Sequence, residues 1–434
     1  MTVLVYTLGV VLFFLGVLAS IALHEVGHMW PAKTFGVKVT QYFVGFGRTV
    51  WSTRRGDTEY GIKAIPMGGY IKMVGMLPPA KLDENGKPKG FSGGVLGQLI
   101  ADARAAEYQH VTDADKDRLF YTRPWWQKVI VMSGGPMMNV LIAVVLLSAV
   151  FMGIGTKEPN LVVSQVSDCV IRASEGIRPC EKGDQVAPAR AAGFQVGDEL
   201  VMLNGEPIKD WDSFSADIRA IRGAEATVVV ERDGEWVTLN ATTIISERPS
   251  LTDENTYVDV GFLGITPDEN YVRQDAGFVA STIGDMTQRT GQALVHMPER
   301  MWGVTKAAFL VDDREQESPM SVVGASRVAG EVASNEEIEV LDKWAGLLTL
   351  LGVVNLFVAL FNFIPLLPLD GGHIAGALYE AIRRGIARVR GRPDPGYADV
   401  AQLLPIAYVA ATVLIVMGAI LVWADIVNPI KLTG

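Results

Sequence analysis

Charged side chains are nearly absent from four long stretches of this sequence. Of its 434 residues, 49% are hydrophobic. The four stretches are residues 3–23, 128–154, 345–369 and 403–427, each of about 20 residues or more. A stretch of that length crosses the ~30 Å hydrocarbon core of a bilayer as a helix, and four of them exclude a soluble protein built around one core. The sequence therefore predicts a polytopic α-helical membrane protein with four transmembrane helices.

The first stretch also lacks the marks of a cleaved leader. No basic residue precedes it, and no clear small-x-small cleavage site ends it. It continues directly into the pair His24 and Glu25. We therefore expect this stretch to be retained as a transmembrane helix; the alternative is a cleaved signal peptide.

Cysteine is scarce, with only Cys169 and Cys180. Both lie in the long loop between the second and third apolar stretches. A disulfide between them is expected in an oxidising compartment, where closing so short a loop contributes roughly 3 kcal/mol. The alternative is two free thiols.

The sequence has no overall excess of positive charge, its net charge being −10. Its basic residues gather beside the apolar stretches: residues 30–128 hold 15 Lys and Arg against 9 Asp and Glu, and residues 374–402 hold 5 against 3. Residues 154–343 hold 17 against 33. The positive-inside rule places the two basic loops in the cytoplasm, with both termini and the acidic loop outside. This distribution excludes a nucleic-acid partner.

Short β-branched and aromatic segments follow the first helix. They are residues 37–44, 48–54, 58–65 and 69–75, separated by glycines and charged turns. They predict a small antiparallel, membrane-associated sheet on the cytoplasmic side, with a hairpin turn at "RRGD". The polar stretch after it is expected to be a loop or insert, for which the sequence indicates no role.

The acidic loop contains a compact unit. "LVVSQV" predicts a strand, "WDSFSADIRAIRG" a helix, and "ATVVVERDGEWVTLNAT" a hairpin turning at Asp233 and Gly234. The run "ARAAGFQVGDELVMLNGEPIKDWDSF" resembles the core of a PDZ domain, a fold that binds extended segments by strand addition. A Gly-Leu-Gly-Phe-type loop is missing, and the alternative is a small β-rich spacer. Residues 276–310 predict an amphipathic helix on the outer surface; the alternative is that its apolar face packs on the PDZ-like unit or on the membrane helices. Residues 318–330 predict a further outer segment lying against the membrane.

The boundaries predicted in this way divide the whole chain. They are 1–30 (first transmembrane helix), 31–77 (membrane-associated β-sheet), 78–127 (cytoplasmic polar insert), 128–154 (second transmembrane helix), 160–270 (extracytoplasmic α+β PDZ-like domain), 271–343 (amphipathic helix and linker), 344–373 (third transmembrane helix), 374–402 (cytoplasmic basic loop) and 403–428 (fourth transmembrane helix).

The motif His-Glu-x-x-His occurs at the inner end of the first helix, in "LHEVGHMW". His24 and His28 are four residues apart, so both rings project from one helix face and can hold one zinc ion. Glu25 lies beside them as a general base for metal-bound water. Ionisable groups are expensive inside a membrane and indicate function. The alternative is a polar triplet that anchors the helix end.

A catalytic zinc site needs a third protein ligand. His110 lies in the polar insert and His296 on the outer side. Asp370 lies about as deep along the third apolar stretch as His24 lies along the first, because each helix enters from outside. Depth therefore favours Asp370. His373 follows it closely and is expected at the membrane interface or behind a ligand.

Two prolines, Pro365 and Pro368, precede Asp370 and break the helix. Irregular backbone at membrane depth is tolerated beside protein or a water-filled cavity, which would bring water to the site. Gly371 and Gly372 (with Asp370, the "LDGG" motif) are expected to let the chain turn after the ligand. Asn362, expected two turns before Asp370 on the same helix, could bind the substrate backbone or another helix.

This combination of motifs resembles the site-2 protease family of intramembrane zinc metalloproteases, in particular the bacterial regulator-of-sigma-E type with an outer PDZ domain. The motifs are "HEVGH", "NFIPLLPLDGG", "GFG", "PMGGYIKM" and "SGGPMMN". The resemblance implies Zn²⁺ held by His24, His28 and Asp370, water activated by Glu25, and substrate bound by Asn362.

The same resemblance implies a place and a substrate. The chain would lie in the bacterial inner membrane, with its site near the cytoplasmic side. It would cut single-pass membrane proteins, either anti-sigma factors or signal-peptide remnants, unwound along the sheet edge. Two other functions stay open: an inactive membrane adaptor with a PDZ module, and a zinc transporter. A polar path through the bilayer, which transport needs, is missing from the sequence.

Overall fold

The computed structural model describes residues 2–80, 94–109, 111–175, 178–250, 256–309, 314 and 318–430. The chain forms two compact units. One consists of Met1–Ile154 with Asp275–Gly434, and we call it the membrane unit. The other, Gly155–Gln274, is the inserted unit. Each is described below by itself.

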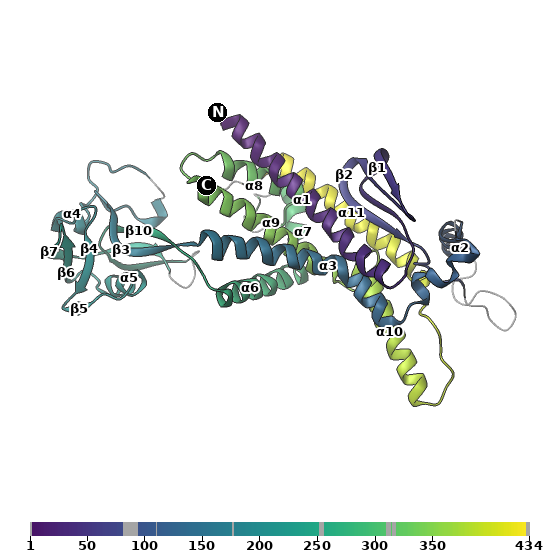
Figure 1. Cartoon of the computed structure of the whole chain (residues 1–434). Coiled ribbons are helices and arrows are strands. Elements are labelled where there is room, and N and C mark those ends of the chain that lie inside the picture. Colours follow the sequence, from purple (N-terminus) through teal and green to yellow (C-terminus); the bar gives the residue numbers. More distant parts are fainter. Residues whose placement is uncertain are drawn as a thin grey trace. The chain divides into compact units, whose positions relative to one another are not determined.

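Four helices of the described residues are long and apolar enough to cross a membrane (Figure 1). They are α1 (Thr2–Thr34), α3 (Trp125–Ser148, continued by a π-helical turn at Ala149–Ile154), α9 (Val340–Asn362) and α11 (Leu404–Val427). At 1.5 Å per residue even the shortest reaches about 34 Å, enough for the hydrocarbon core. The prediction of four spans is confirmed, and the chain is a multi-pass membrane protein.

Helices α1 and α3 meet through glycines. A Cβ atom built on Gly27 would lie 2.3 Å from the carbonyl oxygen of Gly134, and one built on Gly134 would lie 2.0 Å from that of Gly27. Real Cβ atoms do not come so close, so the two backbones touch only because both positions lack a side chain. Small residues that let backbones touch are the usual means of joining helices in lipid.

Helix α8 (Val322–Ser334) packs on α1 through small side chains, Ala325 and Ala329 lying against Phe13 and Val17. The predicted outer segment 318–330 is thus mostly helical. The N-terminus of α8 is held by the carboxylate of Asp425 at the end of α11.

Helices α6 (Ala276–Val295) and α7 (Met297–Ala308) replace the one amphipathic helix predicted over 276–310. The first helix ends at Val295, His296 lies between the two helices, and Pro298 stands in the first turn of the second. Proline lacks the N–H that a continuous helix needs, which explains the division.

Strands β1 (Val39–Arg55) and β2 (Thr58–Met73) form the predicted antiparallel sheet, with its turn at Gly56 and Asp57. Both strands are bent, so each pairs more than once: Phe43 lies opposite Tyr70 on one side and Gly61 on the other. The four predicted short segments are therefore present as parts of two long strands.

Part of the polar insert is helical. It contains α2 (Gly94–Tyr108) and two 3₁₀ turns, Asp113–Arg118 and Phe120–Thr122. Arg104 of α2 makes a bidentate ion pair with Asp399, at 2.6 and 2.7 Å. Residues 81–93 and His110, one of the candidate ligands, lie outside the described residues.

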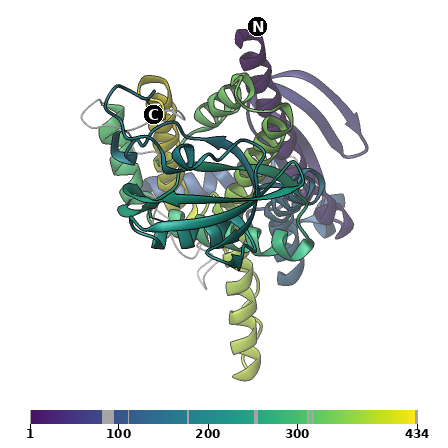
Figure 2. The same ribbon diagram turned by 90° about the vertical axis from the view of Figure 1, so that its left-hand side faces the viewer.

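The inserted unit has an antiparallel sheet in the order β10-β3-β4-β6-β7, with β5 beside β4, and a separate β8–β9 pair (Figures 1 and 2). The strands are β3 (Thr156–Val166), β4 (Glu199–Leu203), β5 (Glu206–Pro207), β6 (Glu225–Arg232), β7 (Glu235–Thr242), β8 (Ile244–Pro249), β9 (Tyr257–Phe262) and β10 (Ile265–Val272). Its helices are α4 (Pro188–Ala192) and α5 (Trp211–Ala220).

An apolar cluster that includes Val163, Phe214 and Val228 fills the interior of this unit. The predicted hairpin turn lies between β6 and β7, where Asp233 and Gly234 both have positive φ. That backbone is typical of a two-residue turn. Cys169 and Cys180 form a disulfide, which confirms the expected bridge.

Candidate metal centre

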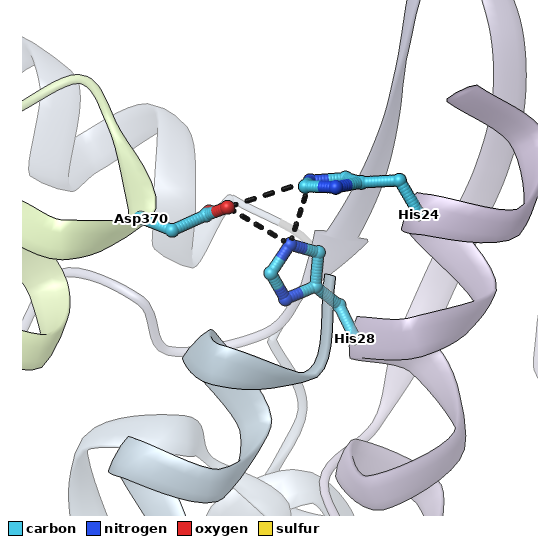
Figure 3. A group of neighbouring side chains, drawn as sticks. All are labelled: His24, His28 and Asp370. Atoms are coloured by element: carbon cyan, nitrogen blue, oxygen red, sulfur yellow. Dashed lines mark hydrogen bonds and ion pairs between the residues drawn. The ribbon is translucent and has the colours of Figure 1, made fainter. Parts of the chain in front are cut away.

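Three side chains from two helices converge in the membrane unit (Figure 3). His24 and His28 project from one face of α1, and their Nε2 atoms lie 3.2 Å apart. The Oδ2 atom of Asp370 lies 3.4 Å from the Nε2 of His24 and 3.2 Å from that of His28. One ligand atom from each residue can be chosen so that all three lie within 4.8 Å of one another. The structure thus brings together the three residues predicted as metal ligands.

A glycine on α3 makes room for the two imidazole rings. A Cβ atom on Gly135 would lie 2.1 Å from the Nε2 of His28 and 2.6 Å from that of His24. Any side chain at this position would displace the rings from each other. The motif His-Glu-x-x-His does not reveal this contact, because the glycine lies more than 100 residues away in the sequence.

The ring of His28 is held in its orientation by a contact on the side away from His24 and Asp370. Its Nδ1 atom lies 2.8 Å from the backbone oxygen of Val131, also on α3. A donor at Nδ1 leaves Nε2 as the lone-pair nitrogen that faces His24 and Asp370. Metal-binding histidines usually have such a backbone or carboxylate partner for the second nitrogen.

Asp370 reaches the histidines from the first residue of α10 (Asp370–Val389). The prediction that Asn362 and Asp370 share one helix is wrong: α9 ends at Asn362, and the chain between them is not helical. Pro365 and Pro368 end the helix because neither can donate the required backbone hydrogen bond.

Gly371 and Gly372 do not provide the expected turn, because both belong to the first turn of α10. They are needed for close packing instead. A Cβ atom on Gly371 would lie 2.2 Å from the oxygen of Ile364, and one on Gly372 would lie 2.6 Å from the nitrogen of Leu367. The two glycines let α10 begin directly against the segment that ends α9.

A cavity of about 340 Å³ opens beside the three ligands. Glu25 lines it, and only 9% of its surface is exposed. Asn362 and Asp370 both line the cavity although they belong to different helices. The full lining is Val17, Ser20, Ile21, His24, Glu25, Gly68, Gly69, Asn139, Val354, Asn355, Val358, Asn362, Pro368, Leu369 and Asp370.

The two other described candidate ligands lie elsewhere. His296 stands at the junction of α6 and α7 with 63% of its side chain exposed. His373 lines a second, much smaller cavity together with Lys128 and Glu380. Lys128 Nζ lies 2.8 Å from Glu380 Oε2, and both side chains are almost fully buried. This ion pair joins α3 to α10, and the sequence analysis did not find it, because its members are 252 residues apart.

The three converging residues offer the donor set of a catalytic zinc site. Two imidazoles and one carboxylate are the three-ligand type that leaves a fourth position open for water. The Nδ1 of His24 is buried and has no hydrogen-bond partner among the described residues. The side chains fit Zn²⁺ in number, chemical type and mutual distance.

Comparison with known proteins agrees with this geometry. Residues 12–393 match the model of peptidase family M50, the site-2 protease family. The chain therefore belongs to this family of zinc metalloproteases, and its cofactor is Zn²⁺. It is 33% identical to the zinc metalloprotease Rip1 of Mycobacterium tuberculosis, over 99% of this chain and all of the relative. Rip1 of Mycolicibacterium smegmatis is also 33% identical with the same coverage. Metalloprotease MmpA of Caulobacter vibrioides is 26% identical over 86% of each chain.

The family and these relatives support an intramembrane zinc metalloprotease. The structure agrees with that class, because the candidate ligands lie on α1, which is one of the four spans, and on α10, which follows another.

Proposed function

We propose that His24, His28 and Asp370 hold the zinc ion, and that Glu25 acts as the general base in the hydrolysis of peptide bonds within transmembrane segments. The observation that carries the proposal is the convergence of three ligand atoms from α1 and α10 beside a buried carboxylate. Bound zinc would supply a water of lowered pKa and an electrophile for the peptide carbonyl.

The residues of this chain would do the remaining work. The carboxylate of Glu25 takes the proton of the attacking water and passes it to the leaving amine. Asn362, at the end of α9 and in the cavity, holds the substrate backbone. Val131 keeps the ring of His28 turned toward the metal through its backbone oxygen.

The substrate is a single-pass membrane protein, either an anti-sigma factor or a signal-peptide remnant. A helical peptide bond is protected by its own hydrogen bonds, so the segment must unwind before attack. The segment of β2 near Gly69 supports a place for this, because Gly68 and Gly69 line the cavity. An extended chain can add to such a sheet edge by main-chain hydrogen bonds.

The chain lies in the bacterial inner membrane with both termini and the inserted unit outside. Support comes from the charge distribution, since the loops at 30–128 and 374–402 contain more basic than acidic residues. The inserted unit acts as a PDZ domain that excludes substrates with bulky outer domains. Its antiparallel sheet and two short helices are consistent with that fold.

Glu25→Gln tests the proposed chemistry, because it keeps the size of the side chain and removes its basicity. We expect the purified variant to retain zinc and to lose cleavage of a model transmembrane peptide. General base catalysis contributes about 10²- to 10⁴-fold, so cleavage should fall by at least 100-fold. Zinc content is measured by atomic absorption and cleavage by mass spectrometry.

Equal cleavage by both forms would overturn the proposal. An adaptor would show cleavage by neither form. A transporter would move zinc across vesicles, also without cleavage.

A further inference from the structure

Asn139 on α3 is buried beside the candidate metal centre, and its side-chain amide has no hydrogen-bond partner among the described residues. Only 2% of its surface is exposed, and it lines the cavity that also contains His24 and Glu25. Its Oδ1 atom is buried and accepts no hydrogen bond from any described residue. A buried polar atom left in this way destabilises a fold by about 1–3 kcal/mol. Such a group is retained at a functional site when a ligand satisfies it.

The position of Asn139 relative to the metal ligands follows from the helix period. Asn139 is four residues after Gly135, so the two lie on the same face of α3. Gly135 packs directly against both imidazole rings. Four residues advance about 6 Å along the helix axis, so Asn139 lies about one helical turn beyond the point where Gly135 contacts the imidazole rings.

Two other polar residues, Ser20 and Asn355, line the cavity and are joined by a hydrogen bond. Ser20 is one turn before His24 on α1, and Asn355 is on α9. The Nδ2 of Asn355 donates to Ser20 Oγ at 3.0 Å and to the backbone oxygen of Leu351 at 2.8 Å. This amide thus connects two helices. The Oδ1 of Asn355 is also buried without a described partner, so the two residues differ in the rest of the amide: Nδ2 of Asn355 is held by two acceptors, whereas the side chain of Asn139 makes no hydrogen bond with another described residue.

We propose that Asn139 accepts a hydrogen bond from a backbone N–H of the unwound substrate, on the outer side of the bond that is cut. The inference rests on the proposed function. An unwound segment inside a membrane has N–H groups without partners, each of which is unfavourable in a dry environment. The substrate's donor and the buried acceptor of Asn139 satisfy each other.

The distances limit which N–H is bound. An extended chain advances about 3.3–3.4 Å per residue. An acceptor about 6 Å along α3 from the imidazole rings therefore reaches an N–H one or two residues from the scissile bond. Asn139 is thus a substrate-binding residue that helps set the register in which the substrate is cut.

The test replaces single N–H groups of the substrate. A synthetic transmembrane peptide is made with one amide changed to an ester, at each of the two bonds on either side of the scissile bond. Each peptide is offered in detergent to the full-length protein and to Asn139→Leu, a variant of similar side-chain size. The ratio kcat/KM and the zinc content are measured for both.

At one ester position we expect the wild-type protein to lose about tenfold in kcat/KM, as for one lost hydrogen bond to a buried acceptor. Asn139→Leu should lose about tenfold on the all-amide peptide and nothing further with that one ester. Its zinc content should equal that of the wild type. A variant that merely loosened the fold would lose a similar factor with every peptide.

Ser326→Ala is the matched control. The hydroxyl of Ser326 on α8 is also buried and without a described partner, but it does not line the cavity. This variant should keep the wild-type response to every ester. If Asn139→Leu fails to accumulate with zinc, Asn139→Ser takes its place, since a hydroxyl on so short a side chain does not reach the substrate.

Two results would overturn the inference. One is unchanged cleavage of the all-amide peptide by Asn139→Leu, and the other is an equal loss at all ester positions. Either can occur while Glu25→Gln still abolishes cleavage with zinc retained, in which case only the role of Asn139 falls. Cleavage by Glu25→Gln would instead overturn the function itself.

Discussion

In the inserted unit the interior is an apolar cluster, whereas the membrane unit buries charged and amide side chains in addition to its apolar clusters. The outward surface is reversed as well. Val3, Leu4 and Ile415 of the membrane unit are 72–79% exposed, as suits side chains that face lipid. In the inserted unit the one buried carboxylate among the described residues is Asp198, which is paired with Arg232.

This difference follows from the solvent. In water, burying apolar surface stabilises the fold. In lipid, burial of apolar side chains gains little, and polar groups are hidden from the hydrocarbon instead. The buried polar groups Glu25 and Asn139 lie on α1 and α3, two of the four helices that can cross the membrane. Mutations should act differently in the two units, and four tests sharpen this contrast.

The largest effect is expected at Gly135, where the two histidine rings pack closely only because the residue has no side chain. Gly135→Ala removes no chemical group, but its methyl would overlap both imidazole rings. We expect the variant to lose zinc and activity by more than the 10- to 100-fold that loss of an outer metal partner usually causes. Zinc content and peptide cleavage measure this. Gly418→Ala in α11, where a Cβ meets no atom within 4 Å, is the control. Full zinc in Gly135→Ala would contradict the geometry.

A buried ion pair of the membrane unit should give the next largest effect. Lys128→Met leaves the carboxylate of Glu380 without its closest cation, and breaking such a pair destabilises by about 3–5 kcal/mol. The double variant Lys128→Met/Glu380→Leu should recover most of this loss. The free energy of unfolding in detergent is the measurement. Equal destabilisation in the single and double variants would show that the charge is not the cause.

In the inserted unit a covalent link should matter more than buried charge. Replacing Cys169 and Cys180 by serine should lower the stability of this unit by roughly 3 kcal/mol, because the unfolded chain gains freedom. The zinc content of the membrane unit should stay unchanged. Limited proteolysis is the measurement, and mapping the cleavage sites by mass spectrometry assigns each cut to one unit or the other. Equal cleavage rates in Gly155–Gln274 with and without the bridge would count against the expectation.

The smallest effect is expected at a surface pair of the inserted unit. Arg178 donates hydrogen bonds to Asp184 and, with the backbone of Glu181, lowers the pKa of that carboxyl to about 2. Because the pKa is lower in the folded state, the ionised carboxyl stabilises the fold at pH values above the unfolded-state pKa, which is about 3.9. This contribution is lost as the pH falls toward the folded-state pKa of about 2.

Cys180 lies between Arg178 and Asp184 in the sequence, so it belongs to the short loop that this ion pair closes. The rate at which a phosphine reduces the Cys169–Cys180 disulfide therefore reports on the ion pair. Arg178→Met should raise the rate at pH 7 by a few-fold at most, since exposed pairs contribute little. The difference from wild type should shrink as the pH falls through 2 and vanish below it, where Asp184 is protonated. A difference that stays at its pH 7 size below pH 2 would assign the effect to packing rather than to charge.

Local patterns allowed much of this structure to be predicted. Four apolar stretches gave four spans, and the spacing of His24 and His28 placed both rings on one face. The turn at Asp233 and Gly234 was predicted because an Asp-Gly pair between two strand-like segments is a strong hairpin signal. Each of these features depends on residues that are close in the sequence.

The features that were missed depend on distant residues. Gly135 packs against His24 and His28 only because α3 lies against α1, and no periodic pattern in the sequence indicates such a contact. Asn362 was placed on the helix of Asp370 because the prolines were expected to interrupt that helix rather than to end it. The packing of α10 against the end of α9 decides this point, and it is a tertiary contact.

The glycine contact between α1 and α3 also limits how the cavity can widen. With the backbones of Gly27 and Gly134 touching, these two helices have no layer of side chains on which to slide, and both histidines project from α1 beside that contact. The opposite wall ends in the short non-helical segment 363–369, where torsion angles can change without breaking helical hydrogen bonds. We therefore expect the α1–α3 side of the cavity to keep its shape, and any widening of the cavity to come from the side formed by α9 and the segment before α10.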